Sequence, residues 1–123
     1  MTTAALNAPQ RAQEYFAGKL DFTISPTEVN EQIENGVKNF IIDVRAVRDF
    51  IRGHVPNAIN LPSGLCDKIS GWRNDRTLII YGYSPTCHLA AHSALEFARQ
   101  GYSVMEMEGG FNVWKENRLP VEV

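Results

Sequence analysis

The segment from residue 77 to about residue 100 constrains the fold more than any other part of the chain. It begins with Thr-Leu-Ile-Ile-Tyr, which has the length and composition of a buried strand. The loop at residues 82–87 follows, and a helix is predicted from about Cys87 to Gln100, with Gly101 as a left-handed cap. A strand that enters a helix through a short loop is typical of a parallel α/β sheet, where ligands bind beyond the carboxyl ends of the strands.

The rest of the chain continues this alternation of strands and helices. Further strands are predicted at residues 21–24, 40–44, 58–60 and 103–107. Helices are predicted at residues 9–18, from Ser25-Pro26 to Asn35-Gly36, at 46–52, over one or two turns at 66–72, and from 110 to 114. For the helix after the loop we predict an apolar face made of Ala91, Ala94, Leu95 and Ala98. The pattern indicates one α/β domain around a parallel sheet.

Composition excludes several classes of protein. The 123 residues suit one domain, and a net charge of −2 without a basic block argues against broad nucleic-acid binding. No apolar run approaches the roughly 20 residues that a membrane span needs, and the start of the chain lacks an export signal. We therefore expect no membrane partner, a cytoplasmic location, and free thiols at Cys66 and Cys87.

Three separated motifs resemble the rhodanese-like domain family. The first is Ile41-Ile-Asp-Val-Arg45 with Asp49-Phe50 and Gly53-His-Val-Pro-Asn-Ala-Ile-Asn-Leu-Pro62, the second is the strand, loop and helix at 77–100, and the third is Glu108-Gly-Gly-Phe111 with Trp114 and Leu119-Pro120. The resemblance implies the rhodanese-like fold, an α/β fold with a parallel five-stranded sheet flanked by helices on both faces. It assigns residues 25–123 to this domain and leaves 1–24 as an N-terminal helix and extension.

The resemblance also implies an active loop whose first residue is a cysteine that carries a persulfide. The family's usual reaction moves a sulfane sulfur from an anionic donor such as thiosulfate to a thiol or cyanide acceptor, and we expect no cofactor. In this chain Gly82 stands at that first position, and the loop cysteine is instead Cys87, its last residue. A thiol at the start of a helix lies near the positive end of the helix, which favours nucleophilic chemistry.

Three interpretations of the loop therefore stay open. In the first, Cys87 is the catalytic nucleophile, and substrate is bound by the loop and its surroundings, namely Gly82, Tyr83, Ser84, Pro85, Thr86, His88 and Arg45. In the second, Cys87 is chemically idle, and the domain is an inactive module that binds an anion or a protein. A third interpretation is a redox pair of Cys87 with Cys66. Ser84 or Thr86 is the predicted N-cap of the helix.

Other polar residues have both structural and functional interpretations. Asp43 and Arg45 form either an internal ion pair or, through Arg45, part of an anion site. His88 and His92 share a helix face, but without a Cys-x-x-Cys motif they do not indicate a metal site. His54 is predicted to make structural hydrogen bonds. A phosphatase loop needs Cys, five residues and Arg, and neither Gly82 nor Cys87 begins such a pattern.

Overall fold

The structure is a computed structural model that describes residues 7–62, 69 and 71–123. Within these residues five parallel strands form one sheet in the order β1-β5-β4-β2-β3. The strands are β1 (Thr23–Ile24), β2 (Phe40–Asp43), β3 (Ile59–Asn60), β4 (Leu78–Tyr81) and β5 (Val104–Met107). The predicted parallel α/β architecture is confirmed, and β4, which precedes the loop, lies in the middle of the sheet.

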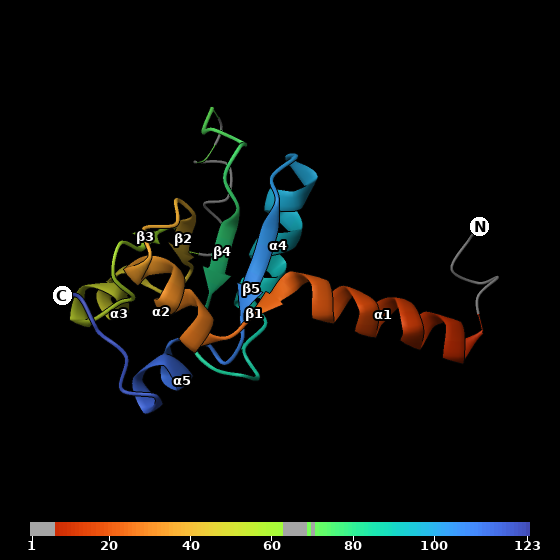
Figure 1. The fold of residues 1–123 in the computed structure, drawn as a ribbon, viewed down its shortest axis with the longest axis horizontal. Helices are drawn as coiled ribbons and strands as arrows, with labels where there is room; N and C mark the ends of the chain where they lie inside the picture. The colour runs from red at the N-terminus through yellow and green to blue at the C-terminus, as the bar shows by residue number, and fades with distance from the viewer. Residues whose placement is uncertain (1–6, 63–68, 70) are drawn as a thin grey trace.

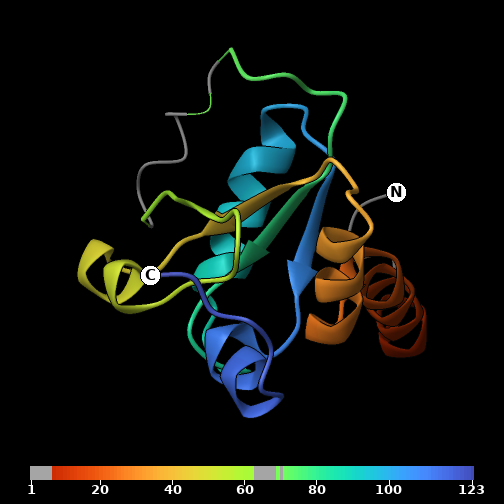
Figure 2. The same ribbon diagram turned by 60° about the vertical axis from the view of Figure 1, so that its left-hand side comes forward.

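Helices cover both faces of this sheet. They are α1 (Ala8–Phe22), α2 (Pro26–Glu34), α3 (Val47–Arg52), α4 (Leu89–Arg99) and α5 (Gly110–Glu116). Helices α2 and α5 lie on one face and α4 on the other (Figure 2). Helix α1 projects away from the layers (Figure 1). No helix among the described residues is long and apolar enough to cross a membrane.

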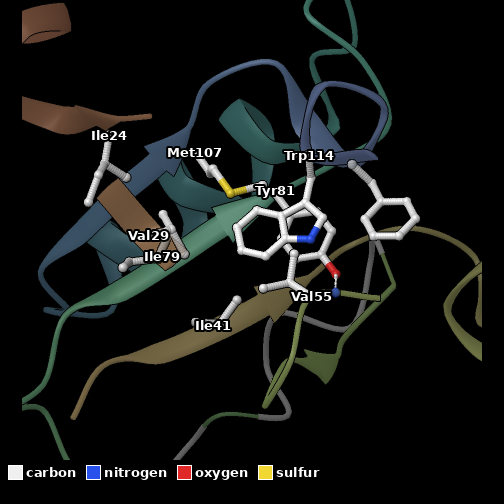
Figure 3. Packing of buried hydrophobic residues seen from close by; sticks show 9 residues of the cluster. Ile24, Val29, Ile41, Val55, Ile79, Tyr81, Met107 and Trp114 are labelled. Atoms are coloured by element: carbon white, nitrogen blue, oxygen red, sulfur yellow. Dashed lines mark hydrogen bonds between the residues drawn. The ribbon is translucent and has the colours of Figure 1, made fainter. Parts of the chain in front are cut away.

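Strand β4 contributes side chains to two hydrophobic clusters, one on each face of the sheet. Ile79 and Tyr81 face α2 and α5, where they pack with Trp114, which is fully buried (Figure 3). Leu78 and Ile80 point to the opposite face and pack with residues of α4. A strand covered on both faces must be apolar at every position, because successive side chains alternate between the faces.

The sequence predicted the start of α2 correctly, but the predicted end of α1 was wrong. The Ser25 hydroxyl accepts a hydrogen bond from the Glu28 amide at 3.2 Å, with Pro26 in the first turn, as the sequence predicted. Helix α1 passes the predicted stop at Gly18 and runs to Phe22, because one glycine costs a helix only about 1 kcal/mol. Strand β1 then pairs with β5, so its two residues join the sheet. The helical turns predicted at 66–72 fall largely outside the described residues.

The predicted apolar face of α4 was wrong at Ala91, Leu95 and Ala98, which are exposed, whereas Ala94 packs against the buried cluster as predicted. The helix buries Ala90, Ser93 and Phe97, whereas Leu95 is 51% exposed. Two apolar stripes run along this helix, and the one that carries the large Phe97 ring faces the sheet because it removes more apolar area from water. The other stripe, which includes Ala91, Leu95 and Ala98, lies on the outer surface.

Candidate active site

The loop between β4 and α4 is held in place by the start of α5. The amide of Phe111 donates to the Gly82 carbonyl at 2.9 Å, and the amide of Asn112 donates to the Tyr83 carbonyl at 2.9 Å. Gly110 makes this close approach possible: with its φ of +64°, a Cβ there would lie 2.7–2.8 Å from the loop backbone. Only glycine fits this position, since any side chain would push the loop away from α5.

Tyr83 anchors the same loop from its other side. Its hydroxyl accepts a hydrogen bond from the Ala46 amide at 3.1 Å and donates one to the Asp49 carboxylate. The hydrogen bond from Tyr83 lowers the pKa of Asp49. Tyr83 therefore ties the loop to the segment that follows β2, and its hydroxyl is engaged in this contact.

Cys87, the last residue of the loop, lies over Gly82, its first residue. The Sγ atom of Cys87 lies 3.3 Å from the point where a Cβ on Gly82 would stand, and Cys87 as a whole is half-buried. The amide nitrogen of Ala90 lies 3.8 Å from the same point. A Cβ at position 82 would therefore be in tight contact with the sulfur of Cys87, which lies on the side of Gly82 where a side chain would stand.

The start of α4 has no side-chain cap. The helix begins at Leu89 rather than at the predicted Cys87, and its N-cap residue, His88, makes no capping hydrogen bond. The predicted cap by Ser84 or Thr86 was wrong, because these two hydroxyls hydrogen-bond each other at 3.4 Å. The first helical amides have no carbonyl partner within a helix, so this end favours a nearby negative charge.

A groove of about 880 Å³ opens beside Cys87, between α1, α4 and β5. Of the predicted site residues, it is lined by Ser84, Pro85, Cys87 and His88, and not by Gly82, Tyr83, Thr86 or Arg45. Two carboxylates, those of Glu106 and Glu108, also line the groove. Burial, and then the charge of Glu108, raise the pKa of Glu106, while Lys19 and His88 oppose this shift.

Arg45 is enclosed in a network at the end of β2 and is 4% exposed. Its Nη2 donates to an Asp43 carboxylate oxygen at 2.8 Å and to the Gly53 carbonyl at 2.7 Å, and its guanidinium lies 4.1 Å from the centroid of the Phe111 ring. Burial alone would lower the pKa of Arg45, but the hydrogen bonds and charge of Asp43 outweigh it, and the pKa is raised. Of the two interpretations left open, the geometry supports the internal ion pair.

The rhodanese-like domain model matches residues 25–117, which include the whole loop and the strands on either side of it. The chain belongs to the rhodanese-like domain family. The match covers the first two motifs and the third as far as Trp114, so the resemblance inferred from the sequence is confirmed.

Known structures have the same fold over nearly the whole of this rhodanese-like domain. The BH2092 protein of Bacillus halodurans is 26% identical, with a TM-score of 0.83 over 93% of this chain and 85% of that chain. A full-length protein of Lactobacillus plantarum is 24% identical, with a TM-score of 0.83 over 94% of this chain and 98% of that chain. The rhodanese-like domain of the Anabaena protein Alr3790 is 25% identical, with a TM-score of 0.72 over 81% and 77% of the two chains.

A curated relative is much longer than this rhodanese-like domain. The HTH-type transcriptional regulator Rv0324 of Mycobacterium tuberculosis is 32% identical over 84 residues. That alignment covers 67% of this chain and 37% of the regulator, so the chain spans about a third of the relative's length.

Sequence reasoning missed the part of the groove that α1 contributes. Tyr15, Lys19 and Phe22 line it opposite α4, and Glu106 forms part of its floor. The sequence predicted a helix at residues 9–18, but nothing local placed that helix beside the loop. Cys66 lies outside the described residues, as does any pairing with Cys87. Among the described residues, no three or more His, Cys, Asp or Glu side chains gather as metal ligands would.

Proposed function

We propose that this rhodanese-like domain is a sulfurtransferase in which Cys87 carries the sulfane sulfur. The observation that supports this most directly is the place of its Sγ atom, 3.3 Å from the Cβ position of Gly82. A nucleophile from the far end of the loop therefore reaches the region that the family's first loop residue serves. The uncapped start of α4 adds a favourable field for a bound anion.

The proposed reaction has two steps. The Cys87 thiolate attacks the outer sulfur of thiosulfate, an S–S bond forms to Cys87, and sulfite leaves with the electron pair of the broken bond. A thiol or cyanide acceptor then attacks the outer sulfur of the persulfide. The S–S bond to Cys87 breaks, the thiolate is regenerated, and the acceptor leaves with the sulfur, as thiocyanate when it is cyanide.

The loop residues divide into two proposed roles. Ser84, Pro85 and His88 line the groove and would contact the donor, as would the amides at the start of α4. Gly82, Tyr83 and Thr86 would shape the loop, and Gly82, which has no Cβ, avoids a tight contact with the sulfur. Arg45 would act through its charge, because its guanidinium is bound to Asp43 and Gly53. A cytoplasmic setting, where thiols stay reduced, is part of this proposal.

The test is to incubate the reduced protein with thiosulfate and to measure its intact mass. We expect one added sulfur atom, located on Cys87 by peptide mapping, that is removed on addition of cyanide with release of thiocyanate. Protein alkylated at Cys87 beforehand is the control. A protein that gains no sulfur, or gains it at another residue, would contradict the proposal.

A second candidate function is an inactive module that binds an anion or a protein, and Gly82 in place of the nucleophile favours it. The variant Gly82→Cys separates the two candidates. If the domain is a sulfurtransferase, reduced wild-type protein already transfers sulfur at a rate comparable with that of the variant. If the domain is an inactive module, transfer is measurable only in the variant.

Oxidation of Gly82→Cys tests the loop geometry itself. The new Cβ would stand 3.3 Å from the Cys87 sulfur, and the corresponding distance in a disulfide is about 3 Å. We therefore expect a disulfide between residues 82 and 87 under mild oxidant, seen as a loss of free thiols and of sulfur transfer. The control is Gly18→Cys, where an added Cβ has no heavy atom within 4 Å. Three free thiols after oxidation of Gly82→Cys, with Cys66 counted, would show that the sulfur does not lie over residue 82.

A further inference from the structure

Helix α1 stands away from the domain with its apolar side chains in solvent (Figure 1). None of its residues is buried against the part of the chain that the structure describes. Tyr15 is 63% exposed, Phe16 58%, Leu20 82% and Phe22 57%. Large apolar side chains occur singly on most protein surfaces, but four on one helix form a patch that requires an explanation.

The large apolar residues of α1 lie on one half of the helix and form a stripe that also contains Lys19. At 3.6 residues per turn, Tyr15, Phe16, Leu20 and Phe22 fall on the same half of the helix as Ala12. Gln10, Glu14 and Asp21 fall on the opposite half. This is the pattern of a helix that packs on a core. A helix of 15 residues is marginal by itself in water, so we infer that α1 is stabilised by packing of this stripe.

A second exposed apolar surface faces α1 across the groove beside Cys87. It is the outer stripe of α4, with Ala91, Leu95 and Ala98, all of which line the groove. Tyr15 and Phe22 line it from the α1 side, so apolar side chains form both walls of an open groove. We call this space the α1–α4 groove.

We propose that the occupant of the α1–α4 groove is helix α1 of a second copy of this chain, in a two-fold symmetric dimer. The chain carries both halves of the contact, namely an apolar helix that projects from the domain and an apolar groove that lacks a cover. A two-fold axis lets each copy insert its helix into the groove of the other, so both surfaces are satisfied at once.

The surface area that the dimer would bury is consistent with a second copy as the occupant. At about 200 Å² for each aromatic side chain, the exposed fractions of Tyr15, Phe16 and Phe22 offer about 350 Å² on each copy. With an equal area of α4 and β5 covered on the other copy, a symmetric dimer buries about 1,400 Å² in total. Specific interfaces bury roughly 1,200–2,000 Å².

The charges also suit a second copy. Glu106 and Glu108 line the groove beside Lys19 of the same copy, while an incoming α1 carries Arg11 at the edge of its apolar stripe and a second Lys19 within it. An incoming α1 thus brings basic side chains to an acidic floor. The net charge of −2 on each copy adds only weak repulsion between them.

A helix in this position forms an outer wall of the groove that Cys87 also lines. The dimer would therefore control access to the loop from solvent. The inference itself does not rest on sulfur chemistry, because neither the stripe on α1 nor the outer stripe of α4 includes Cys87.

The test is the molar mass of the full chain in solution, by light scattering or sedimentation, with two variants that differ only in helix face. The wild-type protein is expected at about twice the chain mass of 13.8 kDa at a concentration of about 100 µM. Phe16→Glu places a charge in the stripe and should raise the dimer dissociation constant at least about tenfold. Ala17→Glu adds the same charge one residue further, about 100° around the helix, and should leave the dimer intact.

A substitution on the groove side completes the experiment. Leu95→Glu changes the facing surface and is expected to dissociate the dimer as Phe16→Glu does. Neither side chain is buried, so thermal unfolding should show that both variants stay folded. Helical circular dichroism should fall in the monomeric variants as α1 loses its support. A wild-type monomer at that concentration, an assembly larger than a dimer, or a dimer that survives either stripe variant would overturn the proposal.

Discussion

Replacement of Asp43 by alanine is expected to lower the free energy of unfolding by about 3–5 kcal/mol. Asp43 has no exposed surface, and its carboxylate binds the Arg45 guanidinium at 2.8–3.1 Å. It also accepts a hydrogen bond from the Tyr81 hydroxyl at 2.5 Å. The substitution therefore leaves a buried positive charge and a buried hydroxyl without their acceptor, which is far more costly than the loss of the contact itself.

The environment of Tyr81 shows how tightly this network is enclosed. Burial, and then the charge of Asp43, raise the pKa of Tyr81, and its oxygen also accepts a hydrogen bond from the Val55 amide at 3.1 Å (Figure 3). The Arg45 guanidinium in turn holds the Gly53 carbonyl. Loss of Asp43 thus weakens the attachment of the segment around residues 53–55 to the centre of the sheet.

An exposed ion pair of the same sequence spacing provides the matched control. Arg73 and Asp75 are also two residues apart and paired, but their side chains are 66% and 54% exposed. Asp75→Ala is expected to change stability little, because water screens and replaces that contact. Thermal denaturation should show a decrease of about 10–20 °C for Asp43→Ala. Equal effects of the two substitutions would show that the buried network is not what supports the sheet centre.

Replacement of Cys87 by serine is expected to reduce sulfur transfer by at least about three orders of magnitude. The hydroxyl of serine has nearly the same size as the thiol but cannot hold a persulfide. The side chain is half-buried, and the loop around it is held by α5 and by Tyr83, so the fold should be unaffected. The effect would therefore be on chemistry and not on stability.

Thiocyanate formation from thiosulfate and cyanide measures this loss. The thermal midpoint of Cys87→Ser should equal that of the wild-type protein, which separates chemistry from unfolding. A surface substitution far from the groove, such as Thr27→Ser on α2, should retain full transfer. If Cys87→Ser transferred sulfur as fast as the wild-type protein, Cys87 would have no covalent role, and the binding function would become the better explanation.

Much of the architecture could be predicted from local patterns. The apolar run in β4 is consistent with a central strand because both faces of the sheet are covered there. Ser25 and Pro26 mark the start of α2 through interactions within one helical turn. Such signals depend on residues a few positions apart, so they can be read without knowledge of the rest of the fold.

The candidate site was predicted only in part, because its arrangement depends on residues far apart in the chain. Local pattern suggested that Cys87 stands near a helix start. It did not show that the sulfur lies over Gly82, which follows from the way the loop folds back onto α4 and α5. The enclosure of Arg45 likewise depends on Gly53 and Phe111, which neighbouring residues in the sequence do not reveal.

The sequence by itself determined the family, the parallel sheet and the loop that ends at Cys87, because strands, turns and helix starts follow from side chains close together along the chain. Only the tertiary structure decided which stripe of α4 faces the sheet, where α1 projects, and how both helices border the groove beside Cys87. Both stripes of α4 contain apolar residues, and the sheet packs against the one with the large Phe97 ring because its burial removes more apolar area from water. That choice leaves the other stripe of α4 in solvent, opposite the exposed side chains of α1.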